Sequence, residues 1–157
     1  MFKSLSLFIT LGLIAMTSAE HVSLKTLLHK FSHPNLQGTV TWGTCPCDGG
    51  FKVDLAKTHS DPLSPKKGDK VQLILSGVWT NDVELDAVKV YVEWNKTPLY
   101  VEEFSRTTSY SEGDSYNDNI GWLIPSFAPT GHYAVKITLH DKGTIKNFGC
   151  LTADVDL

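Results

Sequence analysis

The chain has 157 residues, a net charge of −3 with histidine neutral, and three cysteines. A mildly acidic surface without basic clusters argues against nucleic acid as a partner and against strong attraction to anionic membranes. The length is enough to bury the hydrophobic core of one soluble domain of ordinary size.

Residues 1–19 have the pattern of a secretory signal peptide. Lys3 precedes an apolar run at residues 5–16, and Thr17 and Ala19 stand at the cleavage spacing. The run is about a dozen residues, shorter than the ~20 that span a bilayer, so a membrane anchor is the less favoured alternative. We therefore expect cleavage after Ala19 and a location outside the cell or in the endolysosomal lumen.

Residues 20–41 form an N-terminal lead-in. Apolar side chains at helical spacing predict a short helix or an extended segment: Leu24, Leu27, Leu28 and Phe31. Pro34 ends the run. His29 and His33 are four residues apart and could share a metal, but no third ligand is near in the sequence. We interpret them as surface residues and expect no metal site.

From Phe51 onward, apolar residues alternate with period two, which places successive side chains on opposite faces of a strand. The alternation predicts strands at residues 51–57, 69–79, 87–94, 98–104, 132–140 and 150–157. Turn residues separate these runs, and no long helical pattern follows residue 40. The sequence therefore predicts an all-β fold, an immunoglobulin-like antiparallel β-sandwich of two sheets.

Two connections between the predicted strands carry further information. Asn95, Lys96 and Thr97 form an N-glycosylation sequon at the expected tip of a hairpin, which makes Asn95 a candidate glycosylation site. Pro98 directly after the sequon lowers its use. Residues 105–119 are the longest polar stretch, and we expect a loop there, either a functional rim or a floppy surface segment.

The sequence contains no recognisable catalytic motif. A G-x-S-x-G elbow, an H-E-x-x-H helix, a phosphate-binding glycine loop and a dinucleotide fingerprint are all missing from it. Glu102 and Glu103 are adjacent, so on a strand they face opposite ways and cannot act as an acid and base pair. We interpret them as solvated edge residues and expect no catalytic residues, no cofactor and no enzyme activity.

Three cysteines in an oxidising compartment predict one disulfide and one free thiol. A bond between Cys45 and Cys47 would need a small, strained ring across Pro46. The pair also has too few ligands for structural zinc, and it is not a C-x-x-C redox motif. One of the two is therefore expected to bond to Cys150, and the residues alone leave open which one.

Five pieces of sequence follow one another in an order shared with a known family. They are W-x-x-C at 42–45, DPLSPKKGDKVQLILSG at 61–77, VKVYVEWNKTPLY at 88–100, WLIPSFAPTGHYAVKITLHD at 122–141, and a last strand that opens with Cys150. Together with the signal peptide, they resemble the ML domain, a lipid-recognition family. It includes the Niemann-Pick C type sterol carrier, the ganglioside activator, group 2 mite allergens, and fungal and amoebal phosphatidylglycerol/phosphatidylinositol transfer proteins. The resemblance covers residues 42–157.

The resemblance implies a cavity, which alternation alone does not, because the same inner faces suit an ordinary filled core. Members of the family hold the hydrocarbon part of one lipid between two splayed sheets. On this basis we expect the lipid cavity to be lined by Leu73, Leu75, Val90, Val92, Trp94, Phe104, Trp122, Ile124, Tyr133, Val135 and Ile137. The mouth is expected near residues 104–116 and near Phe127.

The cysteines refine the resemblance in two ways. The shared W-x-x-C spacing favours Cys45 over Cys47 as the partner of Cys150. The sterol carrier and the mite allergens have six cysteines in three disulfides, whereas this chain lacks those in the proline-rich turn and around residues 104–122. The chain is therefore more similar to the phospholipid transfer branch. Lys66 and Lys67 could touch an anionic head group, although the low positive charge argues against a strong site.

Our hypothesis is a monomeric carrier that binds one lipid between its sheets, contacts membranes transiently and moves the lipid between them. A phospholipid, phosphatidylglycerol or phosphatidylinositol, is the first choice, and sterol transport is the alternative. An alternative of another class is an immunoglobulin-like module with a solid core that recognises a protein.

Overall fold

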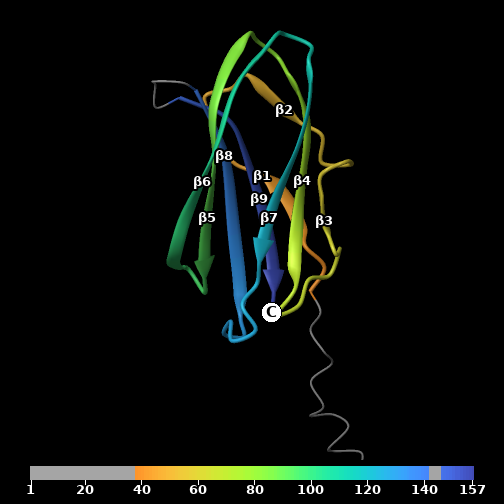
Figure 1. The fold of residues 1–157 in the computed structure, drawn as a ribbon, viewed down its shortest axis with the longest axis vertical. Helices are drawn as coiled ribbons and strands as arrows, with labels where there is room; N and C mark the ends of the chain where they lie inside the picture. Colours follow the sequence, from red (N-terminus) through yellow and green to blue (C-terminus); the bar gives the residue numbers. More distant parts are fainter. Residues whose placement is uncertain (1–37, 142–145) are drawn as a thin grey trace, which may run out of the picture. The chain divides into compact units, whose positions relative to one another are not determined.

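A computed structural model of the chain describes residues 38–141 and 146–157, which belong to one compact unit, Asn35–Leu157 (Figure 1). Its strands are β1 (Thr41–Thr44), β2 (Phe51–Val53), β3 (His59–Asp61), β4 (Lys70–Trp79), β5 (Val83–Trp94), β6 (Thr97–Tyr110), β7 (Ser115–Leu123), β8 (His132–Asp141) and β9 (Asn147–Asp156). Within this part of the chain, no helix is long and apolar enough to cross a bilayer. The expected signal peptide, lead-in helix and histidine pair lie outside the described residues.

The strands form two antiparallel sheets that face each other (Figure 1). The larger sheet has the order β1-β9-β8-β5-β6. In the smaller sheet β7 pairs along nearly all of β4, while β2 and β3 pair with different halves of β4 and so share its other edge. The predicted all-β antiparallel sandwich is confirmed.

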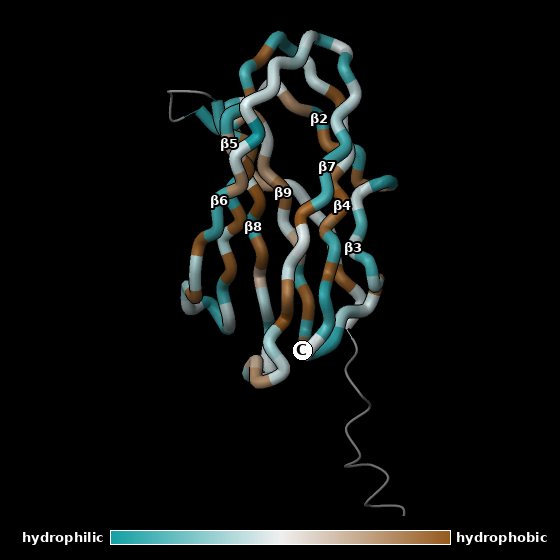
Figure 2. The backbone as a smooth tube through the Cα atoms, viewed as in Figure 1, coloured by the Kyte–Doolittle hydropathy of each residue, from teal (hydrophilic) through white to brown (hydrophobic). Residues whose placement is uncertain are grey.

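The core lies between the inner faces of the two sheets, where the alternating apolar residues meet. Figure 2 shows apolar residues recurring along β4, β5 and β8. Leu75 on β4, Val88 on β5 and Ile137 on β8 are fully buried. The period-two pattern therefore identified the inner positions of these strands correctly, because a sheet with one solvated face needs that alternation.

Five aromatic rings fill one end of the sandwich, which we call the closed end. The rings are Phe51, Trp79, Tyr110, Tyr116 and Phe148, with centroids 4.9 to 5.9 Å apart in the contacting pairs. They come from five strands of both sheets, and Trp79 has no exposed surface. Gly77 makes room for Phe51, since a Cβ there would run into its ring. This aromatic cluster joins the two layers.

The prediction of a loop at residues 105–119 is wrong. Its first part continues β6 to Tyr110 and its last part begins β7 at Ser115, leaving a short turn at residues 111–114. Most side chains of β6 are exposed because it is an edge strand, so the polar composition typical of a loop occurs here in a strand. The strand expected at residues 51–57 also ends early, at Val53, because the Asp54 backbone begins a turn.

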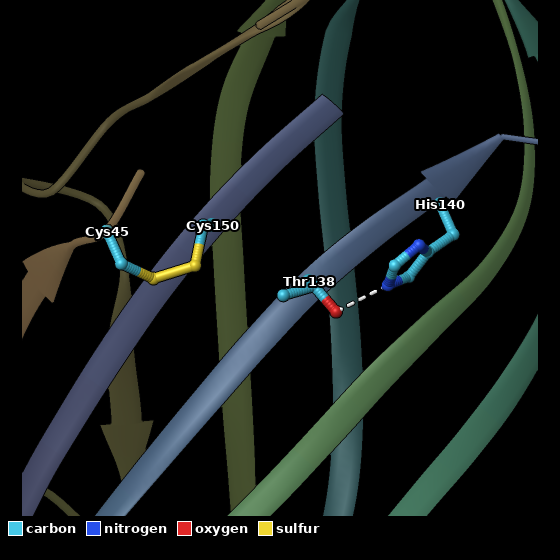
Figure 3. Close-up of a disulfide and its surroundings, with 4 residues drawn as sticks. All are labelled: Cys45, Thr138, His140 and Cys150. Carbon is cyan, nitrogen blue, oxygen red and sulfur yellow. Dashed lines mark hydrogen bonds between the residues drawn. A yellow bond between two sulfur atoms is a disulfide. The ribbon is translucent and has the colours of Figure 1, made fainter. Parts of the chain in front are cut away.

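A disulfide joins Cys45, just after β1, to Cys150 on β9, with Cα atoms 5.0 Å apart (Figure 3). The Cys45 amide also donates a hydrogen bond to the Cys150 carbonyl, at 3.1 Å. Thr138 is the register partner of Cys150 and donates or accepts a 2.7 Å hydrogen bond with His140. The next residue of β9, Leu151, is in the core, so alternation places Cys150 and its disulfide on the outer face of the larger sheet. Cys47 is exposed and free.

Removing this disulfide should destabilise the fold. The bond closes a loop with a sequence separation of 105 residues, and chain entropy gives about 2 to 5 kcal/mol for such a bridge. We expect Cys45→Ser to lower the free energy of unfolding by that amount in urea denaturation, while Cys47→Ser leaves it unchanged. Equal loss in both variants would contradict the pairing.

An apolar pocket as candidate functional site

Each sheet ends in an edge strand on the same side of the sandwich, β6 in the larger sheet and β7 in the smaller one. Within the described residues, β6 pairs only with β5, and β7 pairs only with β4. The chain passes directly from one edge to the other through the turn at residues 111–114. The edges are therefore tied at the turn, and no strand pairing joins them farther away.

A salt bridge holds the two edges together near the closed end. Arg106 of β6 donates from Nε and Nη2 to the two carboxylate oxygens of Asp118 on β7, at 2.7 and 3.1 Å. The Tyr116 hydroxyl donates to the same carboxylate at 2.8 Å. Both charged side chains are mostly buried, and a bidentate guanidinium to carboxylate contact is a strong one. We call this contact the Arg106–Asp118 clamp.

Beyond the clamp the edges enclose a pocket of about 570 Å³, at what we call the open end. Its lining is predominantly apolar and consists of Val92, Leu99, Tyr100, Glu102, Gly121, Trp122, Leu123, Ile124, Pro125, Phe127, Ala128, Pro129 and Tyr133. Val92 and Tyr133 come from the larger sheet, and Trp122 belongs to the smaller one. The pocket thus lies between the layers at one end of the sandwich.

The loop at residues 124–131, which forms one wall of the pocket, is anchored to both sheets. Ile124 exchanges backbone hydrogen bonds with the turn before β4, at 2.9 Å to Asp69 and to Gly68. The Tyr133 hydroxyl of β8 donates to the Pro129 carbonyl at 2.9 Å. Trp94 of β5 donates to the Thr130 carbonyl at 3.3 Å. These contacts fix the wall, and the loop lies at the lower end of the sandwich in Figure 1.

The rim of the pocket exposes apolar side chains to solvent. Phe127 is 87% exposed and Leu123 is 56% exposed, although both line the pocket. Leu99 and Tyr100 are partly exposed on the opposite edge. Large apolar groups gathered at a solvent boundary are typical of interaction sites.

Tyr100 and Trp122 make a contact across the two free edges. Burial of the phenol raises the pKa of Tyr100 to about 12, and a hydrogen bond with the Trp122 side chain opposes part of that shift. The contact places two aromatic side chains from different sheets at the mouth.

The structure brings together four of the eleven predicted lining residues. Val92, Trp122, Ile124 and Tyr133 line the pocket. Five others are buried in the filled core: Leu73, Leu75, Val90, Val135 and Ile137. Trp94 and Phe104 are partly buried and pack against that core. The pocket is therefore confined to one end, with packed side chains beyond it.

Several pocket residues were not predicted, and Tyr100 and Glu102 are the most informative. The register pairs Tyr100 with Val92 and Glu102 with Val90, which places both on the inner side of β6. Phe104 was predicted to face inward, and alternation puts Tyr100 and Glu102 on the same face. The signal was therefore present in the sequence, but the charge of Glu102 suggested a solvated residue.

The expected mouth is corrected in part. Phe127 stands at the rim, as expected, but Tyr116 is fully buried in the aromatic cluster at the closed end. Residues 104–116 run from the pocket side toward that end along β6 and through the turn. The polar residues there belong to edge strands and not to a rim.

The clamp should carry a measurable coupling free energy. In a double-mutant cycle of Arg106→Ala and Asp118→Ala, we expect about 1 to 2 kcal/mol, because the charged partners are mostly buried and bidentate. Urea denaturation of the four proteins gives this value. Arg106→Lys should lose part of it, since lysine lacks the planar fork. A coupling below about 0.3 kcal/mol would show that the clamp does not hold the edges.

Stability should fall at alkaline pH. Burial is the main cause of a raised pKa at four tyrosines: Tyr100, Tyr110, Tyr116 and Tyr133. The folded state therefore keeps phenol protons that the unfolded chain loses near the ordinary value of 10.0. The resulting stability is complete below that pH and is lost as pH rises toward 12. Urea midpoints that stay constant across this range would contradict the burial of these phenols.

Comparison with known proteins finds likenesses both in sequence and in structure. No family model matches the chain. A protein of Dictyostelium discoideum named as a phosphatidylglycerol/phosphatidylinositol transfer protein is 27% identical over 126 residues, which cover 76% of this chain and 87% of the relative.

Among solved structures, the fold is similar to that of a Niemann-Pick type C2 protein from the Japanese carpenter ant. The TM-score is 0.52 at 10% identity, over 74% of this chain and 98% of the other. Chicken MD-1 in complex with lipid IVa gives a TM-score of 0.46 at 12% identity, over 74% and 88% of the two chains. The sequence likeness to the Dictyostelium protein and the fold shared with the ant protein confirm the resemblance of this chain to the ML-domain lipid-recognition family.

Proposed function

We propose that the protein binds one lipid with its hydrocarbon part in the pocket and carries it between membranes, without making or breaking a bond. The observation that carries this proposal is the apolar pocket of about 570 Å³ between two sheet edges that do not pair. Its volume lies within the ~300 to 1,000 Å³ typical of small-molecule sites. The name of the Dictyostelium relative supports a phospholipid as the cargo.

The free edges explain how a chain longer than the pocket could enter. Core side chains fill the space beyond Val92 and Tyr133, so a long acyl chain requires the layers to part. Parting along β6 and β7 breaks no strand pairing. Each buried methylene then contributes ~0.8 kcal/mol, which favours the loaded state. The Arg106–Asp118 clamp would keep the closed end together during this motion.

The rim suits transient contact with a bilayer. Phe127 and Leu123 project at the mouth, and Leu63, which is 64% exposed, lies on the turn between β3 and β4. Lys66 and Lys67 belong to the same turn, and Lys67 Nζ donates to Thr130 Oγ1 of the pocket loop at 2.7 Å. Apolar side chains beside lysines can insert at a membrane surface while the lysines contact phosphates. Together with the disulfide, this favours a secreted or endolysosomal protein.

Transfer of labelled phospholipid between vesicles tests the proposal. We expect the wild-type protein to accelerate transfer and Ala128→Leu to lose most of it, because Ala128 is buried in the pocket wall and the larger side chain fills the site. Ala56→Leu adds the same volume at an exposed turn position and should transfer normally. Thermal denaturation of both variants checks that they are folded.

Two negative measurements together would contradict the carrier function. An organic extract of the native protein without lipid, combined with no transfer of phosphatidylglycerol, phosphatidylinositol, phosphatidylcholine or cholesterol, would refute it. That result would favour an immunoglobulin-like module that recognises a protein. Transfer of cholesterol alone would favour the sterol alternative.

A further inference from the structure

We propose that the mouth of the pocket selects phospholipids whose head group carries an ammonium, and that Glu102 determines this selection together with the neighbouring aromatic side chains. The inference rests on the proposed carrier function and specifies its ligand. The proposed head group differs from glycerol and inositol, the head groups that the name of the Dictyostelium relative gives.

The position of Glu102 puts a carboxylate at the mouth. It lies on β6 opposite Val90, two residues after Tyr100, and therefore on the side of the strand that faces the pocket. It lines the pocket, yet its side chain is exposed. A carboxylate in this place is accessible to a head group that stays at the water boundary while the hydrocarbon part is buried.

The charge at the mouth is negative. Among the described residues that line the pocket, Glu102 alone carries a full charge, and it forms no salt bridge with another described residue. The next cation along β6, Arg106, is neutralised by Asp118. On the outer face, Lys89 pairs with Glu103 at 3.0 Å. Phosphatidylglycerol or phosphatidylinositol would bring its net negative charge close to Glu102, which is unfavourable, whereas an ammonium would be attracted.

The lysines on the turn before β4 do not reverse this balance. Lys66 and Lys70 line a separate surface hollow that also contains Asp61 and Asp69. Lys67 Nζ donates a hydrogen bond to Thr130 Oγ1 of the pocket loop. These groups suit the phosphates of a membrane surface, and they are outside the lining of the lipid pocket.

Aromatic rings complete the recognition chemistry. Tyr100, Trp122 and Phe127 line the same pocket as Glu102. Aromatic faces attract quaternary ammonium groups through their quadrupoles. A carboxylate among such rings is the combination that recognises a choline or ethanolamine head group.

Competition between two phospholipids tests the proposal. Delipidated protein is incubated with vesicles of equimolar phosphatidylcholine and phosphatidylglycerol, isolated again, and extracted for mass spectrometry. We expect the extract to contain about tenfold more phosphatidylcholine than phosphatidylglycerol. This ratio reflects the combined free energies of a cation–π contact and a partly screened ion pair. Glu102→Gln should reduce the ratio to about threefold or less, because the cation–π contact alone remains. Glu102→Lys should shift it further toward phosphatidylglycerol.

Glu103→Gln is the matched control, because the neighbouring carboxylate lies on the outer face. It should keep the wild-type ratio. Equal or greater recovery of phosphatidylglycerol by the wild type, or an unchanged ratio in Glu102→Gln, would overturn the selection while leaving the carrier function intact. Recovery of no lipid at all would instead refute the carrier function.

Discussion

The two free edges, β6 and β7, are the constraint on which the rest of the structure depends. The chain leaves the larger sheet at Tyr110 and enters the smaller sheet at Ser115, so consecutive strands belong to different layers. Each pairs with its own sheet on one edge only, and the two free edges do not pair with each other. This topology leaves a seam along one side of the sandwich, and only side chains can close it.

Those side chains close the seam unequally. At one end the aromatic cluster and the Arg106–Asp118 clamp bind the layers through close ring contacts and a bidentate salt bridge. At the other end the seam is bordered by Tyr100 and Trp122, and the pocket opens there. The disulfide stabilises β1 and β9 on the far side of the larger sheet, away from the seam. One end is therefore packed, while the other contains the pocket.

The sequence predicted much of the fold and less of the site. Alternation located the inner faces of β4, β5, β8 and β9, because one face of each strand is buried. It could not distinguish a filled core from a cavity, and Leu73 and Ile137, which were expected beside lipid, lie in the core of this structure. It also could not predict that the polar residues after Phe104 continue an edge strand, since most side chains of this strand are exposed and give it the composition of a loop.

The pairing of the cysteines and the position of Glu102 depended on tertiary structure. Cys45 lies opposite Cys150 because β1 pairs with β9 in a register that brings Thr44 to Leu151. No local pattern gives that register. Glu102 faces the pocket for a local reason, its parity with Phe104, but its charge indicated solvent. Glu102 both lines the pocket and remains exposed to solvent, because it lies at the edge of the pocket.

The central claim, that a lipid occupies the seam between β6 and β7, is tested most directly by photocrosslinking. A phospholipid with a photoreactive group on its acyl chain is loaded, activated by light, and located by mass spectrometry of proteolytic peptides. We expect adducts in residues 99–102 and 121–129, on the two sides of the pocket. Adducts confined to the outer faces of the sheets, or none above a detergent control, would contradict it.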